Sequence, residues 1–112
     1  MKVLLTTPLR NFDGKIMKDG PGDLLLRNVL IQALSVPMPK DEPTQSVKAT
    51  RFDLGVKIAS SDGEVDLISD EIKILKDLVA MGYVSLIYGQ VAKMLEGQPT
   101  GIEAFVEPKK AE

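Results

Sequence analysis

One stretch of this sequence has residue types suited to calcium chemistry: residues 60–66, SSDGEVD, which precede an expected helix. A calcium loop places acidic residues around a glycine and ends on a helical glutamate. With Gly63 as the sixth loop position, the first position falls on Ile58 and the twelfth on Ser69, so both essential carboxylates are missing. We therefore interpret this stretch as a turn that leads into a short strand and a helix, and we expect no metal site.

The chain contains no histidine and no cysteine. These side chains are the commonest general bases near neutral pH, thiol nucleophiles and transition-metal ligands. The sequence also lacks a phosphate-binding glycine loop, a dinucleotide fingerprint and a nucleophile elbow. We therefore expect no catalytic residue, no cofactor and no enzymatic activity. The alternative is a carboxylate-dependent enzyme, in which two acids among Glu64, Asp66, Asp70 and Glu71 converge in a pocket.

The candidate partner-binding residues are Tyr83, Tyr88 and Gln90, around the junction of the last two expected helices, and Phe105 near the end of the chain. Aromatic side chains with a polar tip are common anchors in binding surfaces. The alternative is that both tyrosines complete the core of a chain with only two tyrosines, three phenylalanines and no tryptophan. Gly89 lies inside the last helix and costs about 1 kcal/mol relative to alanine, which suggests close approach of a neighbouring helix or of a partner.

Two further segments are candidate surfaces. The apolar patch at residues 102–106, which contains Phe105, can add a strand to a partner's sheet edge or fill a pocket, and its alternative is a disordered tail. The segment from Pro37 to Pro43 holds three prolines and is expected to be a loop.

Fourteen basic and sixteen acidic residues leave a net charge of -2, and the pI is about 5.2. A surface that follows nucleic-acid phosphates normally shows as a basic stripe, so nucleic-acid binding is not expected. As an alternative function, a nucleic-acid-associated module would use one of two basic groups: Lys48, Arg51 and Lys57 on the second helix, or Lys2, Arg10 and Lys15 near the N-terminus.

Elements that position these residues follow from the apolar pattern. Val3 to Thr7 is β-prone and, with residues 15–18 as a return strand, predicts an N-terminal β-hairpin. The strand expected at Val65 to Leu67 can join it as a third strand. Helices are expected over residues 24–34, 47–59, 70–81 and 85–96, the first capped by Asp23 and the third by Ser69.

The second helix is expected to turn most of its apolar residues inward. Those residues are Val47, Phe52, Val56 and Ala59, with Leu54 and Ile58 widening the buried face. Together the elements predict an α+β fold in which the hairpin packs on four helices. Residues 1–97 are expected to form a single compact domain and residues 98–112 a flexible tail.

Three stretches resemble small uncharacterised proteins of tailed bacteriophages and prophages: Asn11 to Lys15 before a leucine-rich helix, Glu64 to Leu67 before a capped helix, and residues 83–95 with the run LIYGQ. The similarity covers most of residues 1–97. It implies a phage origin and carries no catalytic residue. The small size, the well-patterned core, the proline loop, the apolar tail and the absence of histidine and cysteine together lead us to expect an accessory phage protein that binds a host or phage protein, either to alter a host process or to assist particle assembly.

The expected location is the cytoplasm, because no stretch has the character of a signal peptide or of a membrane span. The phage resemblance implies that this is the cytoplasm of a bacterial host. The broad apolar helices also allow a homodimer.

Overall fold

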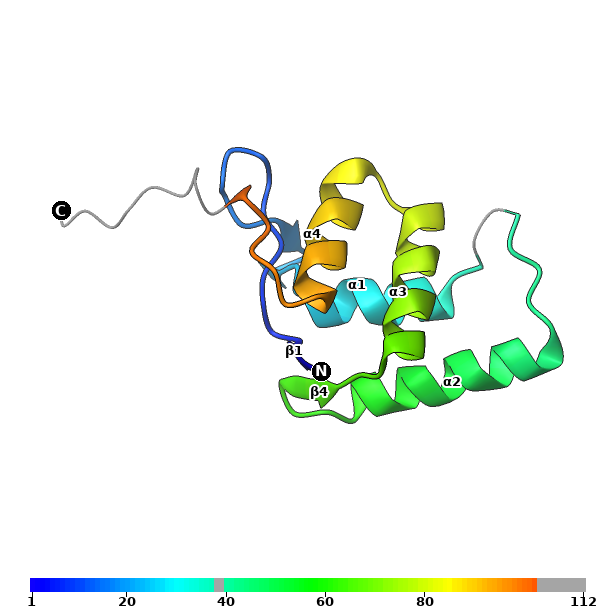
Figure 1. Cartoon of the computed structure of the whole chain (residues 1–112). Helices are drawn as coiled ribbons and strands as arrows, with labels where there is room; N and C mark the ends of the chain where they lie inside the picture. Colours follow the sequence, from blue (N-terminus) through cyan, green and yellow to red (C-terminus); the bar gives the residue numbers. More distant parts are fainter. Residues whose placement is uncertain (38–39, 103–112) are drawn as a thin grey trace, which may run out of the picture.

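Four helices and two short antiparallel strand pairs make up the computed structural model, which describes residues 1–37 and 40–102 (Figure 1). The strands are β1 (Lys2–Leu4), β2 (Lys18–Asp19), β3 (Gly22–Asp23) and β4 (Glu64–Asp66). The helices are α1 (Leu26–Ser35), α2 (Gln45–Ala59), α3 (Ser69–Gly82) and α4 (Ser85–Leu95). The predicted α+β class with four helices is confirmed.

The first strand pairs with β4, at the middle of the sequence, and not with residues 15–18 as expected. Val3 lies opposite Val65 in this antiparallel pair, and both side chains are buried. The segment around Pro8 pairs instead with the residues that lead into α1, through a bridge between Pro8 and Leu25, and a single bridge joins Arg10 to Ile16. The predicted N-terminal hairpin is therefore wrong in its pairing, whereas the strand expected near Val65 does join the N-terminal strand.

A smaller hairpin precedes α1. β2 and β3 are joined through Gly20, whose φ of 65° is in the left-handed region that glycine tolerates best. Asp23, the expected cap of the first helix, belongs to β3 instead and forms an ion pair with Lys18. At the start of α1 the Asn28 side chain accepts a hydrogen bond from the Leu25 N–H at 3.0 Å, so a residue inside the helix replaces the expected cap.

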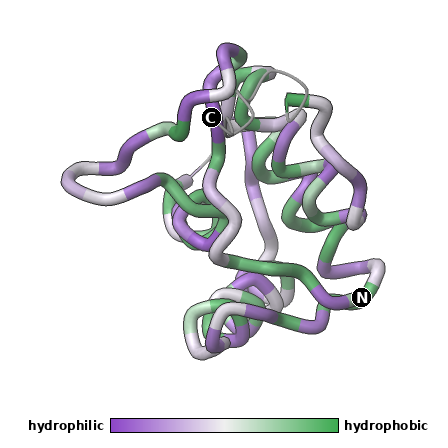
Figure 2. Tube along the Cα trace, turned by 90° about the vertical axis from the view of Figure 1, so that its left-hand side faces the viewer, coloured by the Kyte–Doolittle hydropathy of each residue, from purple (hydrophilic) through white to green (hydrophobic). Residues whose placement is uncertain are grey.

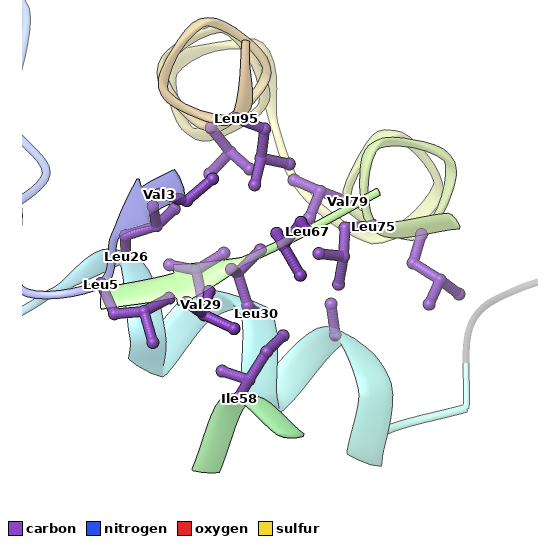
Figure 3. Close-up of a cluster of buried hydrophobic side chains, with 14 of the residues drawn as sticks. Val3, Leu5, Leu26, Val29, Leu30, Ile58, Leu67, Leu75, Val79 and Leu95 are labelled. Carbon is purple, nitrogen blue, oxygen red and sulfur yellow. The ribbon is translucent and has the colours of Figure 1, made fainter. Parts of the chain in front are cut away.

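The core lies where β1, α1, α3 and α4 meet (Figure 3). Its fully buried residues are almost all leucine, isoleucine and valine, which is how a chain poor in aromatic residues fills its interior. From α2 only Leu54 and Ile58 are buried.

The expected helix at residues 70–81 is confirmed as α3, with one extra residue at each end. Ser69 is its first residue and not its cap, because Glu71 accepts the hydrogen bond from the Ile68 N–H at 3.0 Å. After α4 the buried side chain of Ile102 shows that the compact body extends past residue 97. The remainder of the expected tail, residues 103–112, lies outside the described residues. Within the described ranges, no helix has the length and apolarity needed to cross a bilayer.

Candidate functional site

Helix α2 carries apolar residues on two opposite sides. Leu54 and Ile58 face the core, and Leu54 is 2% exposed. At 100° per residue, Phe52 and Val56 fall on the opposite side of the helix. Their exposed fractions are 69% and 50%. The prediction that these two side chains are buried is therefore wrong, because the helix has only one neighbouring layer to cover it. Figure 2 views α2 nearly end-on at the bottom of the molecule and shows hydrophobic segments in this coil.

A groove of about 360 Å³ lies beside this exposed side, between α1 and α2. We call it the α1–α2 groove; its lining consists of Ile31, Leu34, Ser35, Arg51, Phe52, Gly55, Val56 and Ala59. Gly55 lies where the two helices approach each other. A Cβ atom at this position would stand 3.9 Å from Leu34 Cδ1, so the missing side chain leaves a hollow that ordinary contact could fill.

A second cleft of about 440 Å³ continues the groove towards the loop between α1 and α2. The two share Leu34, Ser35, Arg51 and Phe52, and the second also reaches Pro37, Pro43 and Lys48. The proline loop that the sequence marked as a candidate surface therefore borders the α1–α2 groove.

The charges of this region are partly neutralised. Arg51 binds both carboxylate oxygens of Asp41, at 2.6 and 3.3 Å, and both side chains are less than 20% exposed. Lys48 forms no ion pair with any residue in the described ranges. The lining of the groove and its continuation therefore carries one unpaired positive charge.

A second ion pair fixes the other end of α2 to α3. Lys57 Nζ lies 2.8 Å from Glu71 Oε1, the same oxygen that accepts the hydrogen bond from the Ile68 N–H. Burial raises the pKa of Glu71, but these two hydrogen bonds outweigh burial, so the pKa lies below its ordinary value. Glu71 thus caps α3 and holds α2 in place.

The predicted tyrosines lie at the α3–α4 pair, away from the α1–α2 groove. Both are half-buried and pack against the core, which agrees with the alternative that they complete it. Burial raises the pKa of the Tyr83 hydroxyl. Tyr88 lines a cleft of about 610 Å³ between α3 and α4. The ion pairs Lys73–Asp77 and Lys76–Glu96 belong to the same cleft and make its lining charged.

Gln90 is a structural residue, and its assignment to a partner surface is wrong. It is 4% exposed, its Oε1 accepts the Arg10 N–H at 2.8 Å, and its Nε2 donates to the carbonyls of Arg10 and Leu86 at 2.8 and 2.9 Å. A Cβ atom added at the neighbouring Gly89 would meet no atom within 4 Å outside its own helical backbone, so no other helix in the described part of the chain approaches it closely. Phe105 lies outside the described residues.

The four acids considered for catalysis are surface residues. Glu64, Asp66 and Asp70 are exposed, and Glu71 is engaged by Lys57. The N-terminal ammonium group donates to Asp66 Oδ1 at 2.8 Å and lowers the pKa of that carboxyl. Across residues 1–37 and 40–102, no three acidic side chains gather closely enough to hold a metal ion.

Phe52 and Val56 are thus the residues that sequence reasoning missed as a surface. The signal was present, because the apolar residues of α2 fall into two stripes about half a turn apart.

Comparison of the chain with protein-family models, with curated proteins and with solved structures gives no match.

Proposed function

We propose that this protein acts by binding another protein through the exposed side of α2, and not by catalysing a reaction. In this proposal the protein is an accessory protein of a tailed bacteriophage, and its binding alters a host process or assists particle assembly. The phage setting rests on the similarity of the three sequence stretches described above. The binding role rests on the structure of α2.

The observation that carries the proposal is the exposure of Phe52 and Val56 beside an apolar groove. Apolar side chains that gather on a surface next to a hollow commonly mark interaction sites, whereas apolar residues scattered singly do not. Aromatic anchors next to a pocket contribute most of the affinity in many interfaces. The α1–α2 groove supplies both parts of such a site.

The two alternative functions have less support. Of the three basic residues on α2, Arg51 and Lys57 are paired with Asp41 and Glu71, which leaves little net charge for phosphate binding. A carboxylate-dependent enzyme would need acids that converge in a cleft. The acids considered for that role are exposed or ion-paired.

Affinity capture from a bacterial lysate tests the proposal, with the wild-type chain and the double variant Phe52→Ser, Val56→Ser as parallel baits. Both positions are exposed, so the variant should retain the wild-type circular dichroism spectrum and melting temperature. We expect a protein that the wild type retains and the variant loses by at least about tenfold, as for a hot-spot anchor. The interaction should then be reproduced with both purified proteins. Equal retention by the two baits, or no enriched protein, would refute the proposal.

A further inference from the structure

We infer that the α1–α2 groove binds an amphipathic helix of a partner protein, with an acidic side chain of that helix placed against Lys48. This inference rests on the proposed function and specifies its partner. It follows from the elements that line the groove and from their charges.

The lining elements favour a helix over an extended strand. Both walls of the groove are helices, whose backbone N–H and C=O groups are already bonded within α1 and α2. A bound strand would find no backbone partners there, whereas a helix satisfies its own hydrogen bonds and inserts side chains between the two walls. On α2 the lining runs from Arg51 to Ala59, about 12 Å of helix or two turns, which accommodates apolar side chains at i, i+3 or i+4, and i+7.

The charges favour an acidic partner. Arg51 and Asp41 neutralise each other, and Lys48 has no ion-pair partner among the described residues. Lys48 stands in the first turn of α2, which contains no acidic residue, so the positive end of the helix dipole adds to its charge. The acid that α2 does carry, Asp53, is not among the lining residues of the groove or its continuation. Lys48 is therefore the unpaired charge among the described lining residues; Glu42, between Asp41 and Pro43 in the loop, is exposed and is not one of them.

The same charges argue against a second copy of this chain as the occupant. A second copy would bring an identical lining with the same unpaired lysine, so the two surfaces would not be complementary in charge. Complementary charge raises association rates and specificity, and like charges oppose them. The occupant that fits is a different helix with a carboxylate beside its apolar stripe.

A displayed library of 18-residue peptides tests the inference against the full chain. Each peptide has leucine at the i, i+4, i+7 and i+11 positions and random residues elsewhere. We expect the selected peptides to be enriched in Asp and Glu beside the leucine stripe, and to shift the amide resonances of Ile31, Leu34 and Phe52. Lys48→Glu should weaken their binding about tenfold, as expected for a charge at the edge of an interface, and exchanging the peptide carboxylate for lysine should restore it. Lys93→Glu, at an exposed lysine on α4, is the matched control and should leave binding unchanged.

Several results would overturn the inference. Peptides that bind the groove without acidic enrichment, or that ignore Lys48→Glu, would remove the charge assignment. Peptides that shift resonances of α3 and α4 instead would remove the groove. A dimer in sedimentation that Phe52→Asp converts to a monomer would make a second copy the occupant. The proposed function fails separately, if capture from lysate does not depend on Phe52 and Val56.

Discussion

Replacing Gly55 with alanine should stabilise the protein and weaken partner binding at once. Gly55 lies inside α2 with a negative φ, where alanine is favoured over glycine by about 1 kcal/mol. The added methyl group meets only Leu34 Cδ1, at 3.9 Å, so no clash offsets this gain. We expect the free energy of unfolding to rise by about 1 kcal/mol and the melting temperature by about 4 °C. Urea unfolding followed by circular dichroism measures the first quantity.

The same methyl group would fill the hollow between α1 and α2 and displace any side chain bound there. Overpacking an interface costs about 1–3 kcal/mol, so the affinity of a groove-binding peptide should fall about tenfold. Gly89→Ala is the matched control, because Gly89 is also helical and its Cβ would meet no atom within 4 Å. It should give the same stabilisation with no loss of affinity. If Gly55→Ala were destabilising, or bound the peptide as tightly as wild type, the geometry assigned to the groove would be wrong.

Four further substitutions test the fold. Gln90→Leu leaves the Arg10 N–H and C=O groups without partners and should lower the free energy of unfolding, measured in urea, by about 3 kcal/mol. A loss no larger than that of a surface substitution would refute the bridging role of Gln90. Leu54→Ala should cost about 3 kcal/mol and Phe52→Ala less than about 0.5 kcal/mol, and similar costs would contradict the two-sided character of α2. Because the folded-state pKa of Glu71 is lowered, its stabilisation is complete above its ordinary pKa of 4.5 and is lost as the pH falls through the folded value. The stability difference between wild type and Glu71→Gln should therefore shrink below pH 4.5, and a difference independent of pH would exclude the ion pair.

Helix α3 could be predicted almost to its ends because its apolar residues allow only one side of the helix to face the core. Leu75, Leu78 and Val79 fall on a single stripe, and all three are buried. The apolar residues of α2 allow two orientations of the helix, since Leu54 and Phe52 lie on opposite sides of it and either could face the core. The position of α1, on which α2 packs, and the ion pair of Lys57 with Glu71 on α3 decide between them.

The bridge between Gln90 and Arg10 could not be predicted for a different reason. Its partners are 80 residues apart, and the groups that Gln90 binds are backbone atoms, which every residue possesses. No residue type near Arg10 marks it as the partner. The sequence predicts the pairing of β1 with β4 only as a third strand added to a hairpin, because the turn at Asp13-Gly14 is a stronger local signal than a distant strand.

The sequence separation of Arg10 and Gln90 also determines when the N-terminal segment is completed as the chain is made. At about 5–20 residues per second, Gln90 is synthesised roughly 4–16 s after Arg10. Closing a loop of this length costs about 4 kcal/mol of chain entropy, so the contact gains little until α4 has formed to hold Gln90 in place. Val3, whose partner strand β4 lies far along the chain, likewise has no strand to pair with until β4 has been made. The N-terminal segment therefore reaches its full set of contacts only after α4 has been made.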